Sequence, residues 1–180
     1  MSDNRTTSLR TNVAQLLKGP TGAVRRFQLY DEIDDLDEDL IILAPLTGAV
    51  TLLRSADGIL VTASLRTAVE MQCCRCLEPF EGELELEIEE EFEPSIDIHT
   101  GAKLPVRATE QDATIIDEHH ILDLTEVVRQ TIFLAMPMSR ACRNDCAGLC
   151  AVCGKNLNQG PCPCAADDLD PRLEVLRQLL

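Results

Sequence analysis

Aromatic residues and long apolar runs are scarce in this sequence. Its 180 residues include no tryptophan, one tyrosine and four phenylalanines, so a hydrophobic core must be built from aliphatic side chains. The longest apolar runs, residues 40–46 and 132–138, are too short to span a bilayer, and the first residues carry no apolar stretch of the kind that a secretory signal needs. We therefore expect a cytosolic protein that makes no membrane contact.

The common catalytic motifs are absent as well. No GxSxG, P-loop, GxGxxG or HExxH pattern occurs. The three histidines are His99, His119 and His120, and the last two follow Asp117 and Glu118 in what reads as an exposed turn. Because no nucleophile has a plausible base, we expect that the protein is not an enzyme and has no small-molecule substrate.

Basic residues are few relative to acidic ones, 16 against 31, and the formal net charge is -15 at pH 7. Carboxylates concentrate in residues 31–39, which hold seven, and in residues 78–93, which hold nine. Phosphate contacts require Lys and Arg, so this balance disfavours unaided tight binding to naked RNA. The two acidic segments are either solvated faces or a docking surface for a basic partner such as a ribosomal protein.

Cysteine, by contrast, is abundant. Six of the nine cysteines lie in CRNDCAGLCAVCGKNLNQGPCPC, residues 142–164, where Gly148, Gly154 and Gly160 would supply sharp turns. Thiols stay reduced in the cytosol, and a C-x2-C pair at a tight turn forms half of a tetrahedral zinc site, so this density predicts zinc rather than disulfides. The predicted ligands are Cys73, Cys76, Cys142, Cys146, Cys150, Cys153, Cys162 and Cys164, with Cys74 left over.

The eight predicted ligands can be grouped in two ways. In the first, the pair at residues 150–153 is completed by Cys162 and Cys164, and the pair at residues 73–76 is completed by Cys142 and Cys146. In the second, the two C-x2-C pairs join into one ribbon-like site. The spacing alone leaves both groupings open. A site of four thiolates has no open coordination position in either case, which predicts a structural rather than a catalytic role.

The C-x2-C pairs could instead be redox-active, as in thioredoxin-like enzymes. Such a pair is expected where a strand meets the N-terminus of a helix, because the helix lowers the thiol pKa. Cys73 and Cys76 lie between two predicted strands, so this alternative is disfavoured, and we expect Arg75 between them to face solvent. A zinc-ribbon module of transcription is a further alternative.

Alternating apolar and polar residues predict an antiparallel sheet. Strands are expected at residues 23–33, 47–54, 59–71 and 80–92, and the last of them alternates Leu84, Leu86 and Ile88 with glutamates. Gly58 is expected to take a positive φ in the turn between the second and third strands. Helices are expected at residues 13–18, capped by Asn12, at residues 123–135, opened by an Asp123–Glu126 capping box, and at residues 172–180.

These elements predict an α+β fold, with an antiparallel sheet or partial barrel, a few helices and a cysteine-rich zinc-binding loop. Three parts are expected along the chain. They are an α+β domain with the C-x2-C hairpin over residues 1–138, the metal-binding loop over residues 139–168, and a C-terminal helix within residues 169–180.

Five segments carry a resemblance to a known family. They are NVAQLLKGPTGAVRRF from Asn12, CRCLEPF from Cys74, DLTEVVRQTIFLAMPM from Asp123, CRNDCAGLCAVCGKNLN from Cys142 and DPRLEVLRQL from Asp170. Together they resemble the YceD family of large ribosomal RNA subunit accumulation proteins. The resemblance implies a cytosolic, non-catalytic factor for large ribosomal subunit assembly that supports 23S rRNA synthesis, processing or accumulation. Its implied partner is ribosomal RNA, a large-subunit ribosomal protein or both.

Overall fold

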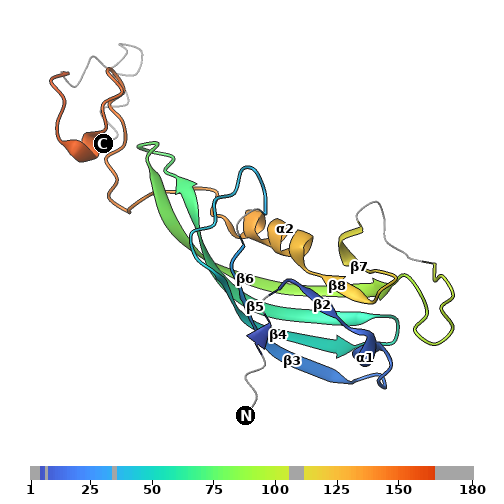
Figure 1. The fold of residues 1–180 in the computed structure, drawn as a ribbon. Helices are drawn as coiled ribbons and strands as arrows, with labels where there is room; N and C mark the ends of the chain where they lie inside the picture. The colour runs from blue at the N-terminus through green and yellow to red at the C-terminus, as the bar shows by residue number, and fades with distance from the viewer. Residues whose placement is uncertain (1–4, 7, 34–35, 106–111, 165–180) are drawn as a thin grey trace, which may run out of the picture. The chain divides into compact units, whose positions relative to one another are not determined.

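The chain forms two compact units. In the computed structural model the described residues are 5–6, 8–33, 36–105 and 112–164, and Figure 1 shows the path of the chain. One unit comprises Met1–Met71 with Phe80–Met138, and the other comprises Gln72–Pro79 with Ser139–Leu180. The turn that carries Cys73 and Cys76 is therefore grouped with the cysteine-rich loop. The helix predicted at residues 172–180 lies outside the described residues.

An open, mixed sheet of six strands forms the base of the first unit. The strand order is β1–β3–β4–β5–β6–β7, so β1 and β7 lie at the two edges. β3 pairs antiparallel with β4 and β4 with β5, whereas β1 joins β3 and β7 joins β6 in parallel. The strands are β1 (Arg5–Thr6), β3 (Val24–Asp31), β4 (Leu46–Arg54), β5 (Ile59–Gln72), β6 (Pro79–Pro94) and β7 (Ile115–Ile116).

The long strands β5 and β6 run antiparallel and divide their side chains between core and solvent. The Ser64 hydroxyl donates to Glu87 (2.7 Å) and Arg66 pairs with Glu85 (2.9 Å), so residue numbers rise on one strand as they fall on the other. The apolar side chains at the centre of β6 are buried and the glutamates between them are exposed. The buried ones are Leu84, Leu86 and Ile88, which confirms the predicted alternation.

An aliphatic core packs against one face of the sheet. α2 (Thr125–Ala135) lies over this face in Figure 1 and buries Val127, Val128 and Ile132. α1 (Ala14–Leu17) and the two-stranded sheet of β2 (Arg10–Asn12) and β8 (Ile121–Asp123) contribute to the same core. The side-chain oxygen of Asn12 accepts the N–H of Ala14 (3.0 Å). The N-cap position of α1 is nevertheless Val13, which makes no side-chain cap hydrogen bond, so the predicted Asn12 cap is corrected.

Helix is a minor part of the described structure. α1 has 4 residues and α2 has 11, and the two 3-10 turns η1 (Asp112–Thr114) and η2 (Leu157–Gln159) add little. The expected α+β class is therefore corrected to a predominantly β fold, because strands of 8, 9, 14 and 16 residues outweigh these helices. The sheet of the described residues is open and mixed, so the expected partial barrel does not form. Neither helix in the described part of the chain has the length and hydropathy of a membrane-spanning segment.

Two local predictions are corrected by the structure. The Asp123–Glu126 capping box does not form, because the N-cap of α2 is Leu124, which has no side-chain cap hydrogen bond. Asp123 accepts the N–H of Thr125 (2.9 Å), and Glu126 accepts from side chains further along the helix. Gly58 does not take a positive φ. A Cβ at Gly58 would lie 2.1 Å from the carbonyl oxygen of Phe92. Close approach of two backbones, rather than a turn conformation, therefore requires glycine at this position.

Candidate metal centre

The eight predicted ligands gather into two groups of four, both in the second unit. The Cys73 cluster contains Cys73, Cys76, Cys142 and Cys146, and the Cys150 cluster contains Cys150, Cys153, Cys162 and Cys164. Within each cluster all four sulfur atoms lie within 4.8 Å of one another. All nine cysteines of the chain are free thiols. The structure therefore adopts the first of the two groupings and does not form the ribbon-like one.

Sulfur spacing in the clusters suits a tetrahedral ion. Metal–sulfur bonds of roughly 2.3 Å place the corners of a tetrahedron about 3.8 Å apart. In the Cys73 cluster the Sγ atoms of Cys73 and Cys146 are 3.8 Å apart, and those of Cys76 and Cys142 are 3.7 Å apart. Both clusters could hold a metal ion without a large rearrangement of the ligands.

The first knuckle, residues 73–78, is a tight turn that aims backbone N–H groups at sulfur. The Cys73 N–H donates to the carbonyl of Glu78 (2.9 Å), and the Leu77 N–H donates to the carbonyl of Cys73 (2.9 Å). The Arg75 N–H points at Cys73 Sγ (3.5 Å). An N–H donor beside sulfur stabilises the thiolate, which is the form that binds a metal.

The second knuckle, residues 150–155, repeats this hydrogen-bond pattern. The Cys150 N–H donates to Lys155 (2.9 Å), the Gly154 N–H donates to Cys150 (2.9 Å), and the Val152 N–H points at Cys150 Sγ (3.4 Å). Gly154 has φ 71°, and Leu77, at the same place in the first knuckle, has φ 60°. A leucine rarely adopts this left-handed conformation, so the residue type at position 77 does not indicate it.

Backbone contacts join the first knuckle to the cysteine-rich loop. The Cys74 N–H donates to the carbonyl of Arg140 (2.7 Å), and the Leu149 N–H donates to the carbonyl of Arg75 (3.1 Å). Gly148 has φ 72°, and a Cβ there would lie 3.2 Å from the same Arg75 carbonyl. Gly148 therefore provides both a turn and the room for this contact. The positive φ values of Gly154 and Gly160 match the turns predicted for them.

Arg75 has a structural contact that the sequence did not indicate. Its side chain is exposed as a whole, yet Nη1 donates to the carbonyl of Cys146 (3.2 Å) and lies 3.4 Å from that of Asn144. The guanidinium thus joins the first knuckle to the Cys142–Cys146 segment. Arg75 is exposed to solvent, as expected, but it also makes this contact, which was not expected. An arginine inside a C-x2-C pair was the only available signal.

Asn158 is the other functional residue that pattern reasoning missed. Its side-chain nitrogen donates to Cys146 Sγ (3.3 Å), while its side-chain oxygen accepts from the N–H of Ala147 (2.9 Å) and from Arg143 (2.6 Å). The N–H of Asn158 is in turn held by the side chain of Asn156 (3.0 Å). Asn158 therefore orients a ligand sulfur from outside the cluster, a role typical of residues around metal sites.

The thiols of the Cys73 cluster differ in acidity. Backbone N–H groups, chiefly that of Cys142, lower the pKa of Cys73 to about 6. The Asn158 amide lowers the pKa of Cys146. Burial raises the pKa of Cys142 to about 12, with a further rise from the neighbouring sulfurs. A metal ion would therefore find some ligands as thiolates and would have to displace protons from others.

The Cys150 cluster has the same electrostatic arrangement in a more open setting. The N–H groups of Cys153 and Val152 lower the pKa of Cys150 to about 6, and the neighbouring Cys153 raises that of Cys164 to about 12. Cys153 is exposed and its three companions are half-buried, whereas three of the four thiols in the Cys73 cluster are buried. The Cys73 cluster is the more sheltered of the two.

Cys74, the leftover thiol, belongs to neither cluster. It is exposed, and its Sγ lies 3.8 Å from the hydroxyl of Ser139. Cys74 is therefore a suitable control for substitutions of the ligands, because it is a thiol between Cys73 and Cys76 in sequence but lies outside both clusters.

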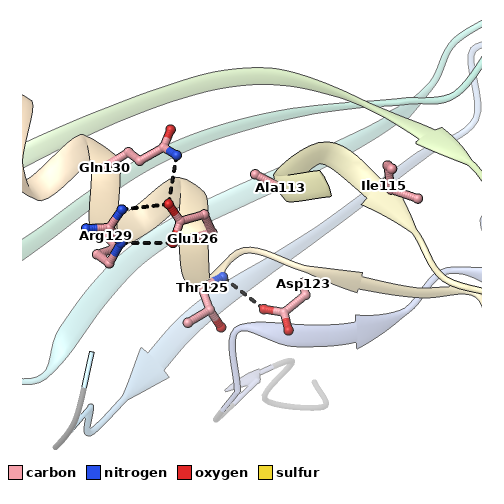
Figure 2. Close-up of a pocket in the computed structure, with 7 residues that line it drawn as sticks. All are labelled: Ala113, Ile115, Asp123, Thr125, Glu126, Arg129 and Gln130. Carbon is pink, nitrogen blue, oxygen red and sulfur yellow. Dashed lines mark hydrogen bonds and ion pairs between the residues drawn. The ribbon is translucent and has the colours of Figure 1, made fainter. Parts of the chain in front are cut away.

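A polar cavity in the first unit carries no comparable chemistry. It has a volume of about 520 Å³ and is lined by Ala113, Ile115, Asp123, Thr125, Glu126, Arg129 and Gln130 (Figure 2). Arg129 pairs with Glu126 (2.7 Å) and Asp37 (3.0 Å), and this contact lowers the pKa of Glu126 to about 2. The charges of Arg129, Glu126 and Asp37 therefore neutralise one another. Outside the cavity, His119 is exposed in a turn, as predicted.

Comparison with known proteins gives a consistent result. Residues 61–180 match the family model described as large ribosomal RNA subunit accumulation protein YceD. An uncharacterized protein of Mycobacterium tuberculosis is 32% identical over 127 residues, which are 69% of this chain and 57% of the relative. A chloroplastic protein of Zea mays, described as large ribosomal RNA subunit accumulation protein YCED homolog 1, is 28% identical over 142 residues, 67% of this chain and 48% of the relative.

This chain therefore spans little more than half of the length of the mycobacterial relative, 57%, and 44% of a further one from Mycobacterium leprae that is 26% identical over 102 residues. No solved structure matches the chain.

Proposed function

We propose, on the premise that this chain belongs to the YceD family of large ribosomal RNA subunit accumulation proteins, that it is a non-catalytic factor for assembly of the large ribosomal subunit. In this role it supports the synthesis, processing or accumulation of 23S rRNA. Its partner is ribosomal RNA, a large-subunit ribosomal protein or both. The observation that carries the proposal is the pair of closed four-cysteine clusters in a chain of this family.

Each cluster, in this proposal, binds one zinc ion. Four thiolates form a soft donor set that suits zinc, and the tetrahedral sulfur spacing of the Cys73 cluster fits its preferred geometry. Hard ions such as Mg²⁺ and Ca²⁺ prefer oxygen ligands, which the clusters do not offer. Elemental analysis of the purified protein tests this directly, with two zinc ions per chain as the expected result.

The proposed zinc ions act as scaffold rather than as reaction centres. Four protein ligands leave no position for a substrate or an activated water. The metal instead holds residues 72–79 to the cysteine-rich loop, so that a defined surface is presented to the assembling subunit. Reduced thiols are needed for this, which supports a cytosolic location.

The experiment is to remove the gene and compare the accumulation of large-subunit rRNA with that of small-subunit rRNA in the same cells. Wild type and Cys74→Ser should restore the ratio, whereas Cys73→Ser should not. Cys74→Ser is the matched control, because it makes the same chemical change one residue away and outside both clusters. An unchanged rRNA ratio in the deletion strain would contradict the assembly role.

The redox alternative is separated by thiol alkylation with and without a chelator. The Cys74→Ser protein is used, because Cys74 is exposed and would react in either case. Thiols that become reactive only after chelation support zinc, whereas one fast thiol in metal-free protein would instead support a thiol oxidoreductase.

A further inference from the structure

The outer edge of β6 has no strand partner over most of its length. β6 covers Pro79–Pro94, but only Glu93 and Pro94 pair with β7, at Ile115 and Ile116. Among the described residues, the backbone of residues 80–92 makes no hydrogen bond on the side away from β5. Figure 1 shows β6 running far beyond β7 along the border of the sheet. Such an edge offers a row of free N–H and C=O groups to another extended chain.

A strong negative charge lies along the same strand. Glutamates alternate along its solvent face, roughly 7 Å apart at every second residue. β5 supplies one cation, Arg66, which already pairs with Glu85 (2.9 Å), while Glu87 accepts from Ser64 (2.7 Å). The exposed carboxylates of Glu81, Glu83 and Glu89 have no cation among the described residues. A cation brought by a partner would relieve the repulsion between them.

We propose that β6 receives a lysine- and arginine-rich extended segment of another protein by β-strand addition. The segment's backbone pairs with the free edge of residues 80–92, and its cations face Glu81, Glu83 and Glu89. Main-chain hydrogen bonds supply affinity in this mode, and alternate side chains supply specificity. The inference deepens the proposed function, on which it rests, by naming the chemistry of the partner.

Two other occupants fit this edge poorly. A second copy of this chain would place two rows of glutamates side by side, which is destabilising and is a common protection against self-association. Nucleic acid would bring phosphates to the same carboxylates and has no backbone N–H and C=O groups with strand spacing. A basic polypeptide satisfies both the unpaired edge and the unpaired charge.

The test uses the full chain and three synthetic ten-residue peptides. The first alternates lysine and valine. The second has the same sequence with N-methyl groups on every other residue, which blocks strand pairing without changing charge. The third replaces lysine with glutamate. We expect the first peptide to bind and to slow hydrogen exchange at alternate amides of residues 80–92, the second to bind about tenfold more weakly, and the third not to bind.

Equal binding of the lysine peptide and its N-methylated form would overturn the inference, because charge alone would then explain binding. Binding without protection of β6 amides, or tighter binding of an oligouridine that protects the same amides, would overturn it too.

Two triple variants of this chain test the same inference by removing charge from the protein instead of from the peptide. Glu81→Gln, Glu83→Gln and Glu89→Gln together should weaken the lysine peptide about tenfold, the sum of three exposed ion pairs. The control removes three exposed carboxylates elsewhere, with Glu38→Gln, Asp39→Asn and Glu118→Gln, and should change affinity less than about twofold. Equal losses in both variants would refute the site. If the peptides fail while Cys73→Ser still lowers rRNA accumulation, only this inference falls and the proposed function stands.

Discussion

Replacing Cys73 by serine should remove one of the two proposed zinc ions and destabilise the protein. The Cys73 side chain is fully buried, with 0% of its surface exposed, and its Sγ lies 3.8 Å from that of Cys146. The same sulfur receives the N–H groups of Cys142 (3.4 Å) and Arg75 (3.5 Å). A structural zinc site contributes roughly 10–16 kcal/mol, so loss of the ion should lower the unfolding free energy by at least about 3–4 kcal/mol, even where the remaining contacts of the turn persist.

The measurements are zinc content and urea unfolding of wild type, Cys73→Ser and Cys74→Ser. We expect two, one and two zinc ions per chain, and a large fall in unfolding free energy for Cys73→Ser alone. Cys74 is exposed and outside both clusters, so it controls for loss of a thiol in this turn. The reasoning would be refuted if Cys73→Ser kept both zinc ions and lost less than about 1 kcal/mol of unfolding free energy. A loss that small is typical of a surface substitution and not of the removal of a buried metal ligand.

Three further predictions follow from burial, charge and close packing. A strong chelator should take zinc from the Cys150 cluster first because its thiols are more exposed; a metal-sensitive dye should show two phases, and Cys150→Ser should lack the fast one. The pKa of Glu126 is lowered from 4.5 to about 2 by Arg129, so its contribution to stability is complete above pH 4.5 and is lost as the pH falls toward 2; urea unfolding should show wild type and Glu126→Gln converging over that range, and a constant difference would contradict it. Gly58→Ala should cost about 3 kcal/mol or more, because its Cβ would lie 2.1 Å from the Phe92 carbonyl; Gly82→Ala, whose φ is not positive and whose added Cβ would meet only the flexible end of the Met71 side chain, is the control in thermal unfolding, and equal losses would count against the packing argument.

Local patterns were sufficient to predict most of the sheet. Period-two alternation for β6, the turn signal between β4 and β5, and the mixed basic and apolar residues of β3 placed these strands within two residues of their observed ends. Such patterns are local, because the side chains of a strand face core and solvent in turn. The two described helices also fall inside the ranges predicted for them, α1 within residues 13–18 and α2 within residues 123–135. The parallel edge strands β1 and β7 were not predicted, because each is only two residues long and pairs with a strand remote in sequence.

The cysteine spacing by itself determined that residues 73–76 and 142–164 carry the candidate metal ligands, since a C-x2-C turn positions two sulfurs through local geometry. Only the tertiary structure decided how the ligands are shared, because Cys73 and Cys146 meet across 73 positions of chain. Three other contacts also join remote parts of the chain. They are the hydrogen bond from Arg75 to the Cys146 carbonyl, the hydrogen bond from Asn158 to Cys146 Sγ, and the close backbone approach of Gly58 to Phe92. Each depends on a distance between segments remote in sequence, which the packing of the whole chain sets and no local pattern encodes.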